Sequence, residues 1–234
     1  MQIKFIRGVR TLRGARLLGA VMATASALSV PLGTPSAQAA APCPDIEVVF
    51  ARGTSEPPGV GGIGQAFVDA VRSDAGTKSV GVYPVNYPAT IDFPTAADGV
   101  VDASNHVRDM ATNCPNTKMV LGGYSQGAAV IGFVTANAVP DGFTPPPTIT
   151  GPMAPDLSKH VAAVALFGKP SPDFLNSIGA PPITIGPLYA AKTIDMCVAD
   201  DPICSQGGGN GMAHAMYAMN GMVGQAADFA VRRV

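Results

Sequence analysis

The sequence predicts a single three-layer α/β domain, in which a central, mostly parallel sheet of five strands is flanked by helices and carries no lid domain. Apolar runs of strand length alternate with helix-like segments along the chain. Several of these runs are unbroken, as in "HVAAVALFG" at 160–168, which is typical of strands covered on both faces. No repeat, heptad or linker divides the sequence, so we expect one hydrophobic core.

The elements follow from local patterns, taken in chain order. Runs rich in β-branched and aromatic residues between turn signals predict strands, and apolar residues three and four positions apart predict helices. A stretch rich in proline and turn residues predicts a long surface loop over 138–158. Strands are expected at 46–51, 79–89, 118–124, 160–168 and 192–197, and helices at 65–76, 96–114, 126–138 and 212–233.

The first 39 residues have the pattern of a secretory signal peptide. Residues 1–16 contain five basic residues and no acidic one, residues 17–30 are apolar, and Ala37-x-Ala39 fits a cleavage site. A membrane-anchoring helix is the alternative, but about 14 apolar residues fall short of the roughly 20 that span a bilayer. We therefore expect cleavage near Ala39, a domain at 40–234, and a secreted protein, either extracellular or associated with the cell envelope.

The charge of the remaining chain argues against several partners. Ten of the 15 basic residues remain against 16 acidic ones, a formal net charge of −6. Nucleic acid requires a basic surface, and anionic lipid headgroups attract basic segments, so both are disfavoured. There is no second apolar stretch of spanning length. We expect no nucleic-acid partner, no stable membrane insertion, and a monomer.

Four cysteines follow the signal peptide and predict two disulfides, because exported proteins fold in oxidising surroundings. Three connectivities are possible. The pairing Cys43–Cys114 with Cys197–Cys204 is favoured, because the last two are close in sequence. A zinc site is the alternative, but the spacing contains no C-x-x-C pair.

Ser125 is the candidate nucleophile. It lies in Gly123-Tyr124-Ser125-Gln126-Gly127, which fits the G-x-S-x-G pattern. In a chain with 27 glycines this pattern is weak by itself. Here, however, a predicted strand precedes it and a predicted helix follows it, as the nucleophile elbow of α/β-hydrolase-type folds requires.

A serine nucleophile needs an oriented base, and the chain contains three histidines. In α/β hydrolases the order is serine, acid, histidine. His106 precedes the serine and is expected on the protein surface. His160 begins a predicted strand and is expected to be structural. His214 follows a glycine-rich loop and is the best candidate base.

The acid is expected between Ser125 and His214, in a loop after a late strand. Asp195, Asp200 and Asp201 qualify by position. Asp195 lies inside a predicted strand, whereas the other two lie between Cys197 and Cys204. Spacing does not separate Asp200 from Asp201.

Acyl transfer also needs donors for the oxyanion of the tetrahedral intermediate. The backbone N–H of Gln126, directly after the nucleophile, is one candidate. The second donor is expected in the loop after an early strand, where Thr54 ends the segment "FARGT".

Together these segments resemble the cutinase family, small lidless serine esterases of the α/β-hydrolase type, and most of all the cutinase-like proteins exported by mycobacteria. The resemblance runs from Cys43 to the last helix. It rests on "FARGT" at 50–54, "GGYSQG" at 122–127, "C-x3-D-x2-C" at 197–204, and a histidine ten residues further on.

The resemblance implies a role for each matching residue. Asp201 becomes the acid, Thr54 and the N–H of Gln126 form the oxyanion hole, and the disulfides are Cys43–Cys114 and Cys197–Cys204. The threonine stands where fungal members have serine, and the proline-rich stretch 142–155 is longer than the fungal pattern.

The implied activity is hydrolysis of short- to medium-chain lipid-like esters by a Ser-His-Asp triad, as in cutinases, lipases or phospholipases A, without metal or organic cofactor. An acetylxylan-type esterase is an alternative, although the chain contains no tryptophan to bind sugars. A catalytically weak secreted surface protein is another.

Overall fold

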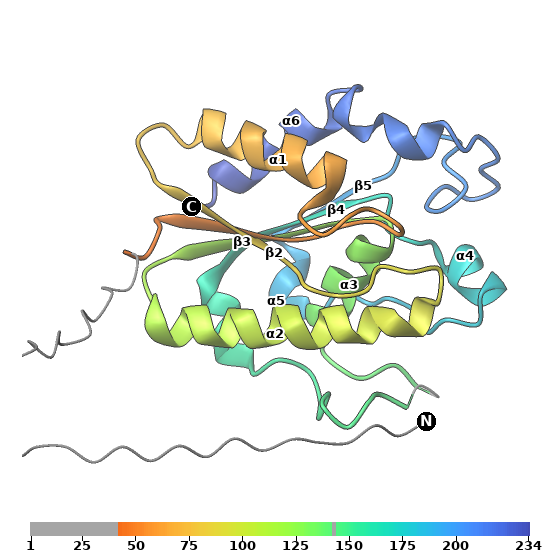
Figure 1. The fold of residues 1–234 in the computed structure, drawn as a ribbon, viewed down its shortest axis with the longest axis horizontal. Helices are drawn as coiled ribbons and strands as arrows, with labels where there is room; N and C mark the ends of the chain where they lie inside the picture. Colours follow the sequence, from red (N-terminus) through yellow and green to blue (C-terminus); the bar gives the residue numbers. More distant parts are fainter. Residues whose placement is uncertain (1–41, 142–143) are drawn as a thin grey trace, which may run out of the picture. The chain divides into compact units, whose positions relative to one another are not determined.

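A computed structural model describes residues 42–141 and 144–234, so the predicted signal peptide lies outside the described residues. The strands form one sheet in the order β2-β1-β3-β4-β5, and every neighbouring pair is parallel (Figure 1). The predicted α/β class and number of strands are confirmed. The strands are β1 (Ile46–Ala51), β2 (Val80–Pro84), β3 (Lys118–Tyr124), β4 (Val161–Phe167) and β5 (Thr193–Met196).

Helices cover both faces of this sheet (Figure 1). The helices α1 and α6 pack against each other on one face, and α2 and α3 pack against each other on the opposite face. The α-helices are α1 (Gly61–Asp74), α2 (Ala96–Asn113), α3 (Gln126–Val134), α4 (Pro172–Ser177), α5 (Pro187–Ala190) and α6 (Met222–Val231), with 3-10 turns η1 (Phe93–Thr95), η2 (Pro155–His160) and η3 (Ala213–Ala218).

Each face of the sheet has its own apolar core, because successive side chains of a strand point to opposite faces. In β1, Val48 and Phe50 pack in the core beneath α1 and α6. Val49 and Ala51 pack in the core beneath α2 and α3. All six residues of β1 are buried, Glu47 among them, so this strand is covered on both faces.

The sheet reverses its order between β1 and β3. The chain moves from β1 outward to β2, then returns to the other side of β1 and continues through β3, β4 and β5. In open parallel sheets such a switch point leaves a crevice at the carboxyl ends of the strands, where ligands bind. Thr54 follows β1 and Ser125 follows β3, so both lie at this crevice.

The last predicted helix, over 212–233, is divided in two. A 3-10 turn, η3, carries His214, and α6 begins only at Met222. Between them Gly221 has a φ of 85°, a left-handed conformation that interrupts a right-handed helix and suits glycine. Periodicity alone does not detect this break, because the apolar spacing continues across it.

His106 was expected on the surface, and this prediction is wrong. Its side chain on α2 is 17% exposed, and its Nε2 lies 2.8 Å from the Oε2 atom of Glu47. Its ring also stacks on Tyr83, with centroids 3.5 Å apart. Glu47 is a buried carboxylate on β1, and a buried carboxylate requires a polar partner. The histidine provides that partner.

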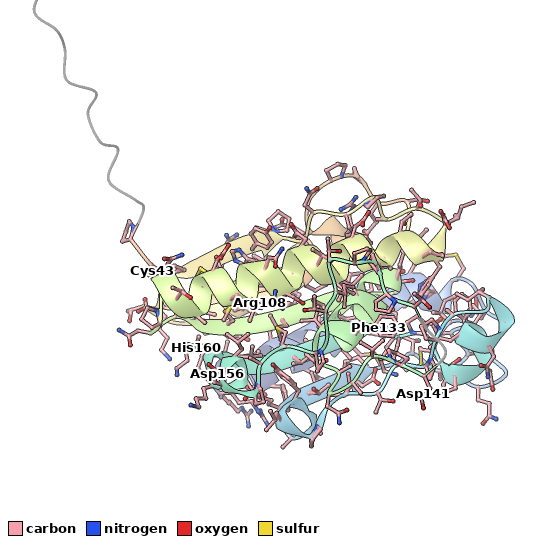
Figure 2. The ribbon with its side chains drawn as sticks, turned by 90° about the horizontal axis from the view of Figure 1, so that it is seen from below. Cys43, Arg108, Phe133, Asp141, Asp156 and His160 are labelled. Atoms are coloured by element: carbon pink, nitrogen blue, oxygen red, sulfur yellow. A yellow bond between two sulfur atoms is a disulfide. The ribbon has the colours of Figure 1, made fainter. Side chains whose placement is uncertain are left out.

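Two disulfides connect Cys43 to Cys114 and Cys197 to Cys204, which is the favoured pairing. The first joins the segments that precede β1 and β3, at the amino ends of the strands, whereas the crevice lies at their carboxyl ends. Figure 2, which views the domain from the α2 side, shows Cys43 at one end and Asp141 toward the other. Within the described ranges, no helix has the length and apolarity needed to cross a membrane.

The two disulfides should differ in their contribution to stability. Their half-cystines are 71 and 7 residues apart. Since a longer loop removes more entropy from the unfolded chain, replacing Cys43 and Cys114 by serine should lower the free energy of unfolding by about 4 kcal/mol, and replacing Cys197 and Cys204 by about 2.5 kcal/mol. Urea unfolding of both double variants measures this difference, and an equal or reversed order would contradict it.

Candidate active site

Ser125 occupies a sharp turn between β3 and α3. Its φ is 56° and its ψ is −118°, a combination that residues with a Cβ atom rarely adopt. Its N–H donates to the carbonyl oxygen of Phe167 on the neighbouring strand, at 2.9 Å. The turn places the serine side chain at the carboxyl end of the sheet, and strained turns of this kind cluster at functional sites.

The two glycines of the motif are required by close contacts of the backbone. A Cβ atom on Gly123 would lie 2.2 Å from the carbonyl oxygen of Gly127. A Cβ atom on Gly127 would lie 2.0 Å from the carbonyl oxygen of Ala51 on β1. Both distances are far below van der Waals contact, so strand, turn and helix approach this closely only with glycine at both positions.

His214 reaches the serine from η3. Its Nε2 lies 2.9 Å from the Oγ atom of Ser125. Tyr124 stacks against its ring with centroids 4.9 Å apart, and the tyrosine hydroxyl donates to the carbonyl oxygen of His214 at 2.8 Å. The imidazole is therefore fixed both by its backbone and by an aromatic neighbour.

Of the three carboxylates that qualified by position, Asp201 is the one that contacts His214. Its Oδ2 and Oδ1 atoms lie 2.8 Å and 3.0 Å from Nδ1 of the imidazole. Asp195 instead forms an ion pair with Lys169, at 3.3 Å. Asp200 turns away, with a φ of 67° and its Oδ1 accepting from the N–H of Gly209.

Asp201 is fully buried, yet its pKa lies below the ordinary value of an aspartate. Burial by itself raises the pKa of this carboxyl group. Hydrogen bonds from Tyr217, His214 and the N–H of Ile203 outweigh burial and hold the pKa below its ordinary value. The carboxylate is therefore ionised at neutral pH and accepts the Nδ1–H of His214, which leaves Nε2 free to accept the proton of the Ser125 hydroxyl.

Tyr217 is a functional neighbour that the sequence did not reveal. Its side chain is fully buried, and its hydroxyl donates to Oδ2 of Asp201 at 2.5 Å and lies 3.3 Å from Sγ of Cys204. It follows His214 by three residues, so one short turn presents both side chains to the same carboxylate. In the sequence, the sign of this role is a tyrosine three residues after the candidate base His214.

The loop after β1, which carries Thr54, is held by a buried arginine. The guanidinium of Arg52 donates to the carbonyl oxygens of Glu56, at 2.9 Å, and of Tyr87, at 2.6 Å. The N–H of Ser55 donates to the carbonyl oxygen of Ala89, at 2.6 Å. These bonds join the loop to the segment between β2 and α2. The sequence pattern did not predict this role of Arg52.

Gln126 begins α3 directly after the serine, so its N–H lies at the first turn of the helix. Its side chain is buried and Nε2 donates to the carbonyl oxygen of Thr90, at 2.8 Å. Gln126 therefore offers a backbone N–H beside Ser125, and its side chain holds the segment that contains Thr90. This side-chain contact was not predicted.

These residues line one cleft of about 580 Å³, within the range of about 300–1,000 Å³ typical of ligand sites. Thr54, Ser125, Gln126 and His214 lie on its wall, and the other lining residues are largely apolar. Within 42–141 and 144–234, no three His, Cys, Asp or Glu side chains gather as metal ligands would.

Removing the Tyr217 hydroxyl should destabilise the protein in a pH-dependent way. Hydrogen bonds to charged groups contribute about 1.5–3 kcal/mol, so Tyr217→Phe should lower the free energy of unfolding by about 2 kcal/mol at pH 7. Because the folded protein holds the pKa of Asp201 below its ordinary value, this stabilisation is lost as the pH falls through that lowered pKa.

Denaturant unfolding of both proteins between pH 7 and pH 2 measures the effect. The difference between wild type and Tyr217→Phe should be largest at neutral pH and should shrink on acidification. A difference that stays constant, or grows, would mean that the hydroxyl does not stabilise the ionised carboxylate.

Comparison with known proteins places these features in a family. The family model described as Cutinase matches residues 42–234. The chain is 61% identical to the probable carboxylesterase Culp5 of Mycobacterium tuberculosis over 168 residues, which cover 72% of this chain and 95% of the relative. It is 48% identical to the phospholipase Culp4 of the same organism over 219 residues, which cover 93% and 90%.

Solved structures agree with this assignment. A Trichoderma reesei cutinase in complex with a phosphonate inhibitor is 33% identical, with a TM-score of 0.62, and the match covers 82% of this chain and 77% of the other. An acetyl xylan esterase structure is 27% identical, with a TM-score of 0.68, and the match covers 82% and 99%. The chain therefore belongs to the cutinase family, a family of serine ester hydrolases.

Proposed function

We propose that the protein is a secreted serine esterase that hydrolyses carboxylic esters with short- to medium-chain, lipid-like acyl groups, using Ser125, His214 and Asp201 as its catalytic triad. The observation that carries the proposal is the continuous hydrogen-bonded chain from the Ser125 hydroxyl through both nitrogens of His214 to the buried Asp201. This is the arrangement that activates a serine for acyl transfer.

In the first half of the reaction, Oγ of Ser125 attacks the ester carbonyl while Nε2 of His214 takes the hydroxyl proton. A bond forms between Oγ and the carbonyl carbon, and the carbonyl electron pair moves onto oxygen. Asp201 holds the imidazole in the tautomer that accepts at Nε2, and its charge stabilises the imidazolium. Collapse breaks the bond to the alkoxide, which leaves with the proton from His214.

In the second half, water attacks the acyl-enzyme. His214 takes a proton from this water, and the acyl carbon–Oγ bond breaks as the carboxylic acid departs. The proton returns to Oγ of Ser125. The imidazole must be neutral to act as base in both halves, so only the unprotonated form of His214 supports the reaction.

The oxyanion formed in both halves is assigned to the backbone N–H of Gln126 and to Thr54. The loop after β1 lies beside the first turn of α3, and both residues line the cleft with Ser125. Donors fixed before the reaction stabilise developing charge without reorganisation. The hydrogen bonds of Arg52 and Ser55 to the segment after β2 keep this loop in place.

The rim of the cleft supports a lipid-like substrate. Ile91 is 90% exposed and Ile178 is 43% exposed, and both line the cleft. Met212, two residues before His214, is also exposed. Apolar side chains gathered around a cleft indicate an apolar ligand or surface. One relative is named phospholipase Culp4, and phospholipids are lipid esters of this class.

The proposal also includes export through the predicted signal peptide at 1–39, and it includes a monomeric state. The net charge of −6 after residue 39 supports an ester or lipid substrate rather than nucleic acid as the partner.

Deacetylation of xylan is a second candidate, favoured by the similarity to the acetyl xylan esterase structure. The chain contains no tryptophan on which a sugar ring could stack. Acetylated xylan, offered beside p-nitrophenyl butyrate and a phospholipid, distinguishes the candidates. Faster release of acetate than of the longer acyl groups would favour xylan.

Replacing the proposed nucleophile should abolish activity while the fold persists. We expect Ser125→Ala to lower kcat for p-nitrophenyl butyrate by about 10⁶-fold, to the background from binding and oxyanion stabilisation. Ser73→Ala, an exposed serine on α1, is the matched control and should keep full activity. Wild-type activity in Ser125→Ala would disprove the proposed mechanism.

The role of Thr54 is tested by two substitutions of similar size. Thr54→Val removes the hydroxyl and should lower kcat by about 10²–10³-fold, the usual cost of one oxyanion donor. Thr54→Ser keeps the hydroxyl and should retain most of the rate. If both variants lose the same amount, the threonine contributes its shape and not a hydrogen bond.

A further inference from the structure

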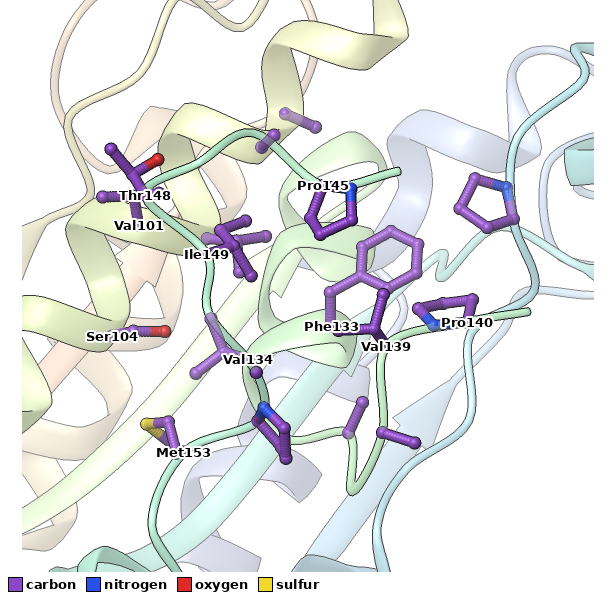
Figure 3. A pocket seen from close by; sticks show the side chains of 18 of the residues that line it. Val101, Ser104, Phe133, Val134, Val139, Pro140, Pro145, Thr148, Ile149 and Met153 are labelled. Atoms are coloured by element: carbon purple, nitrogen blue, oxygen red, sulfur yellow. The ribbon is translucent and has the colours of Figure 1, made fainter. Parts of the chain in front are cut away.

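An apolar groove lies next to the catalytic cleft and takes no part in the chemistry described above. Its walls are the outward side of α2, the end of α3, and described parts of the segment that follows α3. Figure 3 shows Val101 of α2, Phe133 of α3, and Val139 and Ile149 of the following segment around the same space. These side chains come from two helices and the segment after α3, and they line the same groove.

The groove begins at the catalytic cleft. Phe93, Pro94 and Ile178 line both spaces, so the two share a common wall. From there the groove follows α2, where lining residues recur three and four positions apart from Ala97 to Arg108. At 1.5 Å per residue this stretch is roughly 16 Å long. A ligand in the cleft that extends past these three shared residues would lie along the helix.

The lining changes character along this path. Near the cleft it is apolar, with Phe93 on η1 and Ala97 and Val101 on α2. The polar lining residues of α2 are Ser104, Asn105 and Arg108, which lie from the middle of the helix onward. A ligand matched to this groove is thus apolar next to the reacting centre and ends close to water.

The size of the groove selects among apolar ligands. Its free volume is about 160 Å³, similar to an apolar cavity of about 150 Å³ that binds benzene in another protein. A space of this volume is smaller than a single turn of a peptide helix, which is about 10 Å wide and about 5.4 Å long, and suits a single hydrocarbon chain instead. Pro140, Pro145 and Pro152 contribute to the lining, and the fixed φ of proline keeps such a wall preformed.

We propose that this groove binds the acyl chain of the substrate beyond the carbons that the catalytic cleft holds, so that the enzyme prefers esters with an acyl chain long enough to enter it. This inference rests on the proposed esterase function and adds a chain-length preference to it. The chain passes Phe93 and Ile178 and lies along α2, while the ester carbonyl stays at Ser125.

Two substitutions on opposite walls test the proposal. Val101→Trp on α2 and Val139→Trp on the opposing segment each fill the groove from a half-buried position, so failure of one variant to fold leaves the other. Thr112→Trp is the matched control, because Thr112 is exposed on α2 and is not among the lining residues. Melting temperatures establish which variants fold.

The readout is the ratio of kcat/KM for p-nitrophenyl laurate to that for p-nitrophenyl butyrate, with both esters below their aggregation limits. Each methylene returned from an apolar groove to water weakens binding by about fourfold, so this ratio should fall at least about tenfold in both groove variants. The rate with butyrate, whose chain stays in the cleft, should change by less than about twofold, and Thr112→Trp should match wild type.

The outcomes separate the groove from the esterase itself. A normal butyrate rate with an unchanged laurate-to-butyrate ratio in both tryptophan variants would overturn the groove assignment alone. Absence of butyrate hydrolysis in the folded wild-type protein would overturn the proposed function, and the groove assignment with it. A selective loss of laurate activity would support both.

Discussion

The close approach of β1, β3 and the start of α3 at Ser125 is the constraint on which the rest of the site depends. The carbonyl oxygen of Ala51 on β1 and the backbone of the β3–α3 turn meet where Gly123 and Gly127 leave no room for a Cβ atom. Between these two glycines Ser125 has a φ of 56°, and its side chain lies at the switch point of the sheet. The same close approach sets the first turn of α3 beside the loop that carries Thr54.

The remaining catalytic groups reach Ser125 on irregular segments, and each is held by specific bonds. The acid is fixed by the Cys197–Cys204 disulfide and by Tyr217, which also keeps it ionised despite its burial. His214 is fixed by Tyr124 through stacking and a hydrogen bond. A rigid sheet with braced loops suits acyl transfer, in which misplacement by about 1 Å costs about 100-fold in rate.

Much of the fold and of the candidate site could be predicted from local patterns. Apolar runs of strand length identified the strands, most clearly β4, which is buried on both faces, and G-x-S-x-G identified the turn because only glycine fits there. Residues that act through tertiary contacts were harder to identify, because local patterns do not show their partners. Tyr217 and Arg52 bind groups that are distant in sequence, and His106 was misplaced because its partner Glu47 lies 59 residues away. The break at Gly221 was hidden by uninterrupted apolar spacing.

The central claim is that Ser125 is activated by His214 and Asp201. Covalent labelling with a fluorophosphonate, followed by peptide mass spectrometry, tests it most directly, because this reagent reacts rapidly only with an activated serine. The account predicts one label per molecule, located on the peptide that contains Ser125, and a labelling rate that collapses in His214→Ala. Absence of label on the folded protein, or label on a different serine, would contradict the account.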